Sequence, residues 1–394
     1  MLGSWIDLGL VTCDLAPCIK IFLIETNFCV LPKQNLYPRK ENGPRLVTFS
    51  SFKSHPSVKF LGSLLGFAVV VGLTFLGLLA ITFFIGRVVP IDPVLAVVGD
   101  RATQELYDAT REAMGLNRPL VIQFFDYVGD VLRGDLGQSI STNRPVVDDL
   151  TRVFPATLEM ATIGIIIGVL LGVPMGVYAA AHKGSWIDQV IRVFALLGYS
   201  VPAFWLGLVG LAVFYAGLGW VSGPGRVDIF YEGLVEPRTG LLLVDSIIAG
   251  DWDVFWNAAS HLLLPATILG FFSLAYIARM TRSFMLDQLG QEYITTARVK
   301  GIPEWRVIWI HAFRPILVPL ITVIGLSYAG LLEGSVMIET VFSWPGIGNY
   351  LTVALLNADM NAVLGATLVI GSVFIFINKI SDVLYRVLDP RSRS

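Results

Sequence analysis

Histidines and cysteines are the residues of this chain best suited to metal binding and nucleophilic chemistry, and their spacing supports neither. The histidines are scattered, with no second ligand at metal-binding spacing: His55, His182, His261 and His311. The cysteines are odd in number, one short of the usual four-ligand zinc site, and lie close to the N-terminus: Cys13, Cys18 and Cys29. We expect free, reduced thiols on the cytosolic side, with a metal site as the alternative.

Phosphate-binding and nucleophile motifs are also missing from the sequence. No G-x-x-x-x-G-K-[ST] loop occurs, and Gly346-Ile347-Gly348 lacks the third glycine of a dinucleotide-binding fingerprint. No Gly-x-Ser-x-Gly elbow is present. The sequence alone does not exclude a Ser-His-Asp triad formed by residues that are distant along the chain. The sequence therefore predicts a protein that is not an enzyme and that carries no cofactor.

Composition places the chain among membrane proteins. Of its 394 residues, 55% are hydrophobic and 15% are charged, and the mean hydropathy is +0.70. The net charge of −2 argues against nucleic-acid binding, which needs a basic face. A spanning helix needs roughly 20 apolar residues, and six stretches qualify, at about 61–86, 157–181, 187–220, 262–285, 317–338 and 362–385. We predict an all-α polytopic membrane protein with six transmembrane helices.

Basic residues are divided unevenly between the loops, and this division sets the predicted orientation. Nineteen of the 28 Lys and Arg residues lie before the first span, after the second, between the fourth and fifth, and in the C-terminal tail. The loop at 339–361 has none, and the loop at 87–156 is acidic, with ten Asp or Glu against seven Arg. Both termini are therefore expected on the cytoplasmic side.

The long outer loop between the first two spans is expected to fold as a helical cap. Leu106, Ala109 and Ala113 have helical spacing, and Gly115 is predicted to end this helix. Residues 120–132 predict a second helix in the same loop.

Glycines recur at every fourth position of the second span, at Gly164, Gly168, Gly172 and Gly176. This spacing puts them on one helical stripe, where another helix backbone can come close. We expect tight helix packing there, and a moving interface would use the same stripe. Pro174 and Pro202 predict kinks in the second and third spans.

A basic, amphipathic segment separates the fourth and fifth spans, with the sequence QEYITTARVKGIPEWRVIWIHAFRP (291–315). Ile294, Ala297 and Gly301 share one narrow face of a predicted helix. Gly301 is expected to end that helix in a left-handed cap, and Pro303 to open the next helix. Two interpretations are open: an ordinary interfacial loop, or a docking element whose small-residue face fits a groove on a cytosolic partner.

Glu333 is predicted to lie inside the fifth span, a few residues below the outer surface. Carboxylates inside a membrane are rare and usually face a pathway or a partner. The sequence leaves two roles open. In the first, Glu333 forms a structural ion pair with an arginine such as Arg87 or Arg144. In the second, Glu333 faces a pore and receives a cationic group such as a peptide amine.

The 291–315 segment resembles the cytoplasmic loop shared by permease subunits of binding-protein-dependent ABC importers, whose pattern is Glu-Ala-Ala, three residues, Gly. Here Thr295-Thr296-Ala297 and Gly301 occupy those positions, a form typical of the dipeptide/oligopeptide/nickel branch, although Pro315 replaces its usual Asn. Similar stretches cover about residues 60–390: FIGRVVPIDPV (84–94), GLNRPLVIQFFDYVGDVLRGDLGQSI (115–140), RVFPATLEMATIGIIIGVLLGVPMGVYAA (152–180), GYSVPAFWLGL (198–208), HLLLPATILG (261–270) and ETVFSWPGIGNYL (339–351).

The resemblance implies a B-type permease subunit that performs no bond chemistry itself. The implied partners are a second, C-type permease, two ABC ATPases, an extracytoplasmic solute-binding protein and membrane lipid. The implied ATPase-coupling residues are Glu292, Thr295, Thr296, Ala297, Arg298, Lys300 and Gly301. The expected pathway and outer gate comprise Glu333, Glu339, Phe342, Trp344, Pro345 and Gly346, with an interfacial anchor as the alternative role of Trp344.

The function implied by the resemblance is translocation of di- or oligopeptides across the cytoplasmic membrane, and nickel chelates and oligosaccharides are other substrates of the branch. An ion-coupled secondary transporter and a non-transport scaffold are the rival classes. We expect an N-terminal extension of unknown role, or a wrongly assigned start, at 1–58, and a first helix with the outer loop at 59–156. A transporter domain at 157–388 with a coupling loop at 286–315, and a tail at 389–394, complete the expected organisation.

Overall fold

A computed structural model of the chain describes residues 56–88, 93–99 and 101–388. The contacts divide the chain into two units, Met1–Lys59 and Phe60–Ser394. The three cysteines, His55 and nearly all of the predicted 1–58 extension lie outside the described residues, as does the predicted tail.

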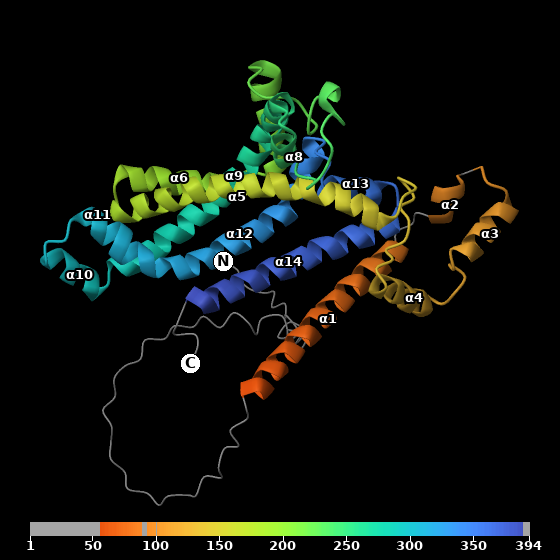
Figure 1. Cartoon of the computed structure of the whole chain (residues 1–394), viewed down its shortest axis with the longest axis horizontal. Helices are drawn as coiled ribbons and strands as arrows, with labels where there is room; N and C mark the ends of the chain where they lie inside the picture. The colour runs from red at the N-terminus through yellow and green to blue at the C-terminus, as the bar shows by residue number, and fades with distance from the viewer. Residues whose placement is uncertain (1–55, 89–92, 100, 389–394) are drawn as a thin grey trace, which may run out of the picture. The chain divides into compact units, whose positions relative to one another are not determined.

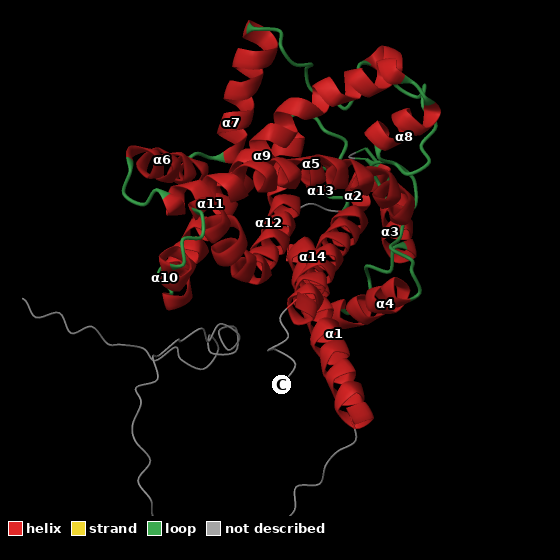
Figure 2. Cartoon of the chain, turned by 60° about the vertical axis from the view of Figure 1, so that its left-hand side comes forward, coloured by secondary structure: helices red, strands yellow, loops and turns green. Residues whose placement is uncertain are grey.

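Helices make up the described part of the chain, which contains no strand longer than an isolated bridge between Gln138 and Pro145 (Figures 1 and 2). In chain order the helices are α1 (Pro56–Val88), α2 (Pro93–Val98), α3 (Gln104–Ala113), α4 (Leu120–Leu132), α5 (Val146–Ala181), α6 (Trp186–Ser200), α7 (Ala203–Gly210), η1 (Leu211–Gly217), η2 (Ile229–Tyr231), α8 (Leu242–Ala249), α9 (Trp252–Leu289), α10 (Glu292–Val299), α11 (Glu304–Arg306), η3 (Val307–Ala312), α12 (Phe313–Val341), α13 (Ile347–Leu356) and α14 (Met360–Leu388). The all-α prediction is confirmed.

Four helical stretches in the described part are long and apolar enough to cross a membrane: Val146–Ala181, Trp252–Leu289, Glu304–Val341 and Met360–Ser381. A fifth arises if Trp186–Gly198 and Ala203–Gly217 count as one broken span. Helix α1 is 33 residues long, and Ala68–Phe84, the part of it whose side chains the structure describes, is also apolar.

The predicted span at 187–220 is bent by 98° between α6 and α7, so this stretch is a broken span or a re-entrant loop. Val201 has an extended backbone, with φ −100° and ψ 126°, and Pro202 precedes the first turn of α7. The residue before a proline avoids the helical region, so α6 cannot continue through this point. The kink predicted at Pro202 is thus present as a complete break, whereas α5 runs uninterrupted through Pro155 and Pro174.

The centre of the unit is the pair α5 and α9, which pack along the glycine stripe of α5. A Cβ atom on Gly164 would lie 3.1 Å from the Leu269 Cβ, and one on Gly176 would lie 2.6 Å from the Ala278 carbonyl oxygen. Larger side chains would push the two helices apart, so the small residues set this close approach. Helices α12 and α14 pack beside this pair.

The outer loop contains the two helices that the sequence predicts. Helix α3 begins after Thr103, whose hydroxyl accepts a hydrogen bond from the Leu106 N–H, and Gly115 follows it with a φ of +67°. Helix α4 packs against α1 and α14 through Phe124, Phe83 and Leu364. Figure 1 shows α3, α4 and α13 toward one end of the long helices and α10 and α11 at the other end.

Candidate functional site

Helix α10 and the turn after it have the backbone that the sequence predicts. Gly301 has a φ of +73°, its N–H donates to the Arg298 carbonyl at 2.9 Å, and the Ile302 N–H donates to the Ala297 carbonyl at 3.2 Å. This is the left-handed cap that glycine favours. Pro303 then precedes the first residue of α11, Glu304.

The face of α10 that carries Ile294 and Ala297 is turned into the chain itself. Both side chains are buried in a cluster with Met285 of α9, Val307 of η3 and Ile316 of α12. These apolar side chains are thus removed from water inside the same chain, and the coupling role of Ala297 stays a prediction. The cluster instead attaches α10 to the ends of the long helices.

The rest of the α10 surface and the turn after the helix are open. The exposed residues include all the other predicted coupling residues: Glu292, Thr295, Thr296 and Arg298 in α10, and Lys300 and Gly301 in the turn. They also include Tyr293 and Val299, which the sequence analysis did not select, and the Val299 side chain is 83% exposed. A largely polar surface with one apolar residue at its tip is thus available to another molecule.

An ion pair closes the turn between α10 and α11. The Arg298 guanidinium donates to both carboxylate oxygens of Glu304, at 2.6 and 3.2 Å. Both side chains are about half exposed, so the pair adds little to stability and mainly orients the turn. After it, the chain is helical without a break from Glu304 to Val341, through a π-helical stretch at Val307–Ala312. This continuous helix connects the turn after α10 directly to α12.

At the other end of α12, Glu339 is fully buried and is held by four donors. Its Oε1 accepts from the hydroxyls of Thr157 and Ser335, at 2.8 and 2.9 Å. Its Oε2 accepts from the N–H groups of Gly348 and Asn349, at 2.7 and 3.1 Å. The carboxylate thus satisfies the free N–H groups at the start of α13. In this conformation Glu339 does not line an open pathway and acts as a clamp inside the chain.

The hairpin between α12 and α13 is packed under this clamp. Phe342 and Trp344 are buried, and the Trp344 indole N–H donates to the Ala156 carbonyl at 2.9 Å. The alternative role of Trp344 as an interfacial anchor is wrong, because its polar end is bonded inside the protein. Gly346 is buried, a Cβ atom on it would lie 2.5 Å from the Thr157 hydroxyl oxygen, and Pro345 is exposed.

Glu333 lies one turn and a half before Glu339 and has different surroundings. Its side chain is exposed on the surface of this single chain. Among the described residues no cation pairs with it, so the predicted ion pair with Arg144 is absent, and the side chain of Arg87 lies outside the described residues.

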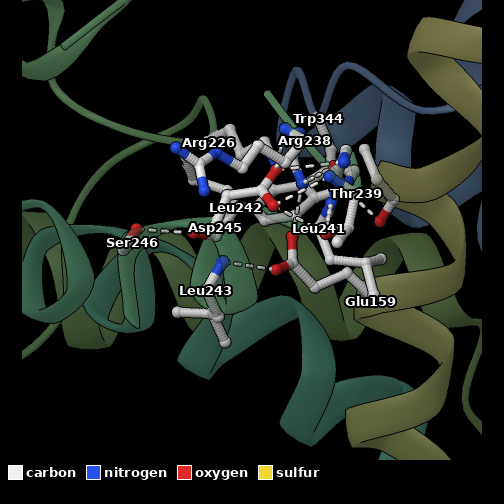
Figure 3. A network of polar contacts seen from close by, with 12 residues as sticks. Glu159, Arg226, Arg238, Thr239, Leu241, Leu242, Leu243, Asp245, Ser246 and Trp344 are labelled. Atoms are coloured by element: carbon white, nitrogen blue, oxygen red, sulfur yellow. Dashed lines mark hydrogen bonds and ion pairs between the residues drawn. The ribbon is translucent and has the colours of Figure 1, made fainter. Parts of the chain in front are cut away.

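A second buried network lies beside the hairpin (Figure 3). Arg226 Nη2 donates to Glu159 Oε2 at 2.6 Å and to the Gly240 carbonyl at 2.8 Å, while Glu159 Oε1 accepts from the Leu243 N–H at 2.7 Å. The guanidinium also lies 6.0 Å from the centre of the Trp344 ring. These contacts join α5, the connection between η1 and α8, and the hairpin.

Sequence comparison with known families gives matches that together cover most of the chain. The sequence profile of the binding-protein-dependent transport system inner membrane component matches residues 172–394, and the profile of the N-terminal part of such membrane components matches residues 58–161. The chain belongs to this family.

Individual relatives match over nearly their whole length. The probable D,D-dipeptide transport system permease protein DdpB of Escherichia coli K12 is 41% identical over 315 residues, which is 80% of this chain and 92% of that one. The di/tripeptide transport system permease protein DppB of Pseudomonas aeruginosa is 39% identical, over 81% of this chain and 95% of the relative. The dipeptide transport system permease protein DppB of Escherichia coli K12 is 40% identical over the same shares.

As a permease of an ABC importer, the chain is an inner-membrane transport component and not an enzyme. The residues that the structure describes contain no group of three or more His, Cys, Asp or Glu side chains that could hold a metal ion. His261 lies buried, with its ring nitrogens toward the Gly223 carbonyl and Asp228, as a structural residue.

Sequence reasoning missed the buried ion pairs of this permease. Glu159 pairs with Arg226 as described above, and Asp188 of α6 pairs with Arg282 of α9. A usable signal was present, because Glu159, Asp188 and Arg282 all fall inside the apolar stretches predicted to span the membrane. Charges in such segments usually have a partner, so these three residues could have been predicted to form ion pairs, as Glu333 was.

Proposed function

We propose that this permease carries di- or oligopeptides across the cytoplasmic membrane as one of two permease subunits, driven by separate ATPases. The observation that carries the proposal is the identity of about 40% to peptide permeases over more than nine-tenths of their length.

The proposed topology has six spans with both termini in the cytoplasm. The spans are α1, α5, the broken pair α6 with α7 and η1, α9, α12 and α14. The distribution of basic residues supports this orientation, because α10 and α11 lie in the most basic loop and α13 in a loop without Lys or Arg.

Helix α10 is the proposed contact with an ATPase. Its exposed face is the one that carries Thr295, Thr296 and Lys300, and its buried face is fixed to α5, α9 and α12 by the Ile294–Ala297 cluster. A partner that binds the exposed face more tightly in one conformation would thereby bias the arrangement of the spans.

The hairpin at 342–346 and α13 are the proposed outer gate. Glu339 and Thr157 hold α13 against α5, and opening would have to break these hydrogen bonds together. Glu333 is exposed on α12, the helix that also carries Glu339. We propose that it faces the pathway between the two permeases and receives the amino group of a peptide there.

Co-purification from native membranes tests this function. The full chain, isolated in mild detergent, is expected to bring down two ABC ATPases and a second, related permease, identified by mass spectrometry. Reconstituted with these subunits and the solute-binding protein, the complex is expected to hydrolyse ATP faster when a dipeptide is added. A folded chain that is reproducibly isolated alone would overturn the proposal in favour of a secondary transporter.

A further inference from the structure

Helix α8 has its polar residues on the inside and its apolar residues on the outside. Asp245 and Ser246 are buried, whereas Val244, Ile247 and Ile248 are exposed, Ile247 by 51%. Positions 244, 247 and 248 have the spacing i, i+3 and i+4, so their side chains lie on one face of the helix. This arrangement is the reverse of the one expected for a helix that faces water.

The buried polar residues of α8 have their partners inside the chain. The Asp245 carboxylate accepts from the N–H groups of Arg238, Thr239 and Gly240, at 3.2, 2.9 and 3.0 Å (Figure 3). The Ser246 hydroxyl donates to a backbone carbonyl one turn earlier in the helix. These hydrogen bonds hold the polar side of α8 inward, and therefore hold its apolar face outward.

The apolar face continues onto the start of α9. Gly250 ends α8 with a φ of +74°, and α9 begins two residues later at Trp252. Trp252 and Trp256 are exposed one turn apart, and Leu263 is exposed on the same side of α9 two turns further on. Helix α9 is long and apolar enough to cross a membrane, and tryptophan is enriched where such helices meet the membrane surface.

The short helix η2 brings two more apolar side chains to this region. Ile229 and Phe230 are exposed, Phe230 by 90%. The N–H of Asp228, the residue before them, donates to Asn257 Oδ1 at 3.0 Å, and Asn257 Nδ2 donates to the Asp228 carboxylate at 2.6 Å. Because Asn257 directly follows Trp256, these bonds place η2 next to the first turns of α9.

The charges around this apolar surface are mostly negative. Between residues 228 and 253, all of which the structure describes, the exposed acids are Asp228, Glu232, Glu236 and Asp253, and the exposed base is Arg238. Anionic lipid attracts basic segments, so this region gains nothing from it. The favourable free energy for contact with a membrane comes instead from burial of the apolar side chains, which a zwitterionic bilayer supplies.

Helix α8 also lies away from the helix that is proposed to meet the second permease. Figures 1 and 2 show α8 on one side of α5, and α12 and α14 on the other side. Glu333, which is proposed to face the second permease, belongs to α12. An exposed apolar surface with a polar rim marks contact with a protein or with a membrane. The position of α8 and its continuity with α9 favour the membrane.

We propose that α8, η2 and the first turns of α9 form an interfacial anchor that inserts into the outer leaflet of a zwitterionic bilayer. Interfacial helices typically bury their apolar face about 5–10 Å into the boundary between headgroups and acyl chains. Ile247, Ile248 and Phe230 lie there, and the surrounding carboxylates stay among the headgroups. The inference rests on the proposed topology, which puts the connection between η1 and α9 on the outer side.

Fluorescence quenching by brominated lipids tests the anchor. The full chain, with its three native cysteines replaced by serine, carries Ile248→Cys, Leu263→Cys or Glu112→Cys labelled with bimane, in phosphatidylcholine nanodiscs. Lipid brominated near the headgroup should quench the label at 248, and lipid brominated deeper in the chains should quench the label at 263. Glu112, exposed on α3, is the aqueous control, and its label should be quenched by dissolved iodide alone.

Three outcomes would overturn the anchor. Quenching of the label at 248 by iodide and not by lipid, with the label at 263 quenched by lipid, would reject the anchor and leave the proposed topology intact. Absence of lipid quenching at both positions would reject the topology of α9 as well. Lipid quenching at 248 that disappears in the assembled transporter would show that another subunit covers α8. Quenching needs no transport, so a chain that inserts α8 but carries no peptide would count only against the proposed function.

A charge on the apolar face connects the signal to this surface. Ile247→Glu, with the label kept at 248, should lose most of the quenching by lipid brominated near the headgroup and gain quenching by iodide, because a carboxylate resists transfer out of water. Ile247→Leu is the matched control and should be quenched as the parent is. Ile247 is half exposed, so neither substitution disturbs a packed site. Equal lipid quenching in the two variants would contradict the insertion of this face.

Discussion

Arg282 forms a bidentate ion pair with Asp188. The Arg282 Nε and Nη2 donate to Asp188 Oδ1 and Oδ2, at 2.6 and 2.9 Å respectively. Asp188 lies in the first turn of α6, its side chain is 1% exposed, and it also accepts from the Gly184 N–H. Arg282 lies two turns before the end of α9. The pair therefore fixes the start of α6 to α9, at the end of the unit that carries α10 (Figure 1).

Breaking this pair should cost stability. Asp188→Asn leaves the guanidinium of Arg282 without its counter-charge in a mostly buried site, and such losses typically cost about 3–5 kcal/mol. The thermal unfolding midpoint of the detergent-purified protein should fall clearly. Asp287→Asn, which alters an exposed carboxylate of α9, is the control and should leave it within error. An unchanged midpoint in Asp188→Asn would mean that the pair contributes no net energy.

Neighbouring residues of α10 should respond in opposite ways to enlargement. Ala297→Phe forces a large ring into the buried cluster and should destabilise the protein by about 1–3 kcal/mol. Thr296→Phe changes only the exposed face, so stability should stay constant while substrate-stimulated ATPase activity of the reconstituted complex falls. Equal effects of both variants on stability would contradict the inward orientation of Ala297.

The ends of two helices and the positions of the outer-loop helices were predicted correctly from local sequence patterns. The stops at Gly115 and Gly301 both have positive φ, and the two outer-loop helices lie where apolar spacing put them. These features depend on the intrinsic conformational freedom of glycine and on helical periodicity, which act over a few residues.

The side to which a helix face turns, and the contacts between residues far apart in the sequence, could not be predicted in the same way. Ile294 and Ala297 form a small apolar face that suits a partner or the chain itself, and periodicity does not say which. The hydrogen bond between Glu339 and Thr157 joins residues that are 182 positions apart in the sequence, so no local spacing predicts it. Pro202 predicts a kink, but the 98° bend between α6 and α7 could not be predicted, because Pro174 predicts a kink in the same way and α5 continues through it.

Removing the charge of Glu339 should loosen the hairpin. The neutral amide in Glu339→Gln offers one acceptor oxygen where two now serve four donors, so buried N–H groups lose their partner. We expect a destabilisation of about 1–3 kcal/mol, measured as a lower thermal unfolding midpoint. Glu333→Gln, on the exposed side of α12, should keep the parental midpoint and slow peptide uptake. Parental uptake in Glu333→Gln would exclude the pathway role.

Asp245 should make the outer connection sensitive to acid. Burial alone would raise its pKa, but hydrogen bonds from Thr239, Gly240 and Arg238 outweigh it and hold the pKa below its usual range. A lowered folded pKa stabilises the protein fully above the unfolded pKa of about 3.9, and this contribution disappears as the pH falls through the folded value.

Unfolding midpoints between pH 7 and pH 3 check this prediction. Asp245→Asn should lower the midpoint at pH 7 and reduce its fall at acid pH, because the variant has no carboxylate to protonate. Asp253→Asn, an exposed neighbour, should follow the parental curve. Parallel curves for the parent and Asp245→Asn would show that Asp245 does not govern the acid response.

Gly301 gives the sharpest test of α10 as the coupling element. No atom lies within 4 Å of the position that a Cβ would take, so a substitution meets open space, and its internal cost is the left-handed backbone, about 1–2 kcal/mol for most residues. Gly301→Trp should therefore still insert in the membrane but lose substrate-stimulated ATPase activity, because the ring covers the exposed surface beside Lys300.

The matched control is Gly301→Asn, since asparagine tolerates the left-handed conformation and adds little bulk. It should retain most of the stimulation. Normal stimulation in Gly301→Trp would show that an ATPase does not contact this turn. Equal loss in both variants would show that the backbone of the turn, rather than its open surface, carries the effect, because only the tryptophan ring obstructs an approaching protein.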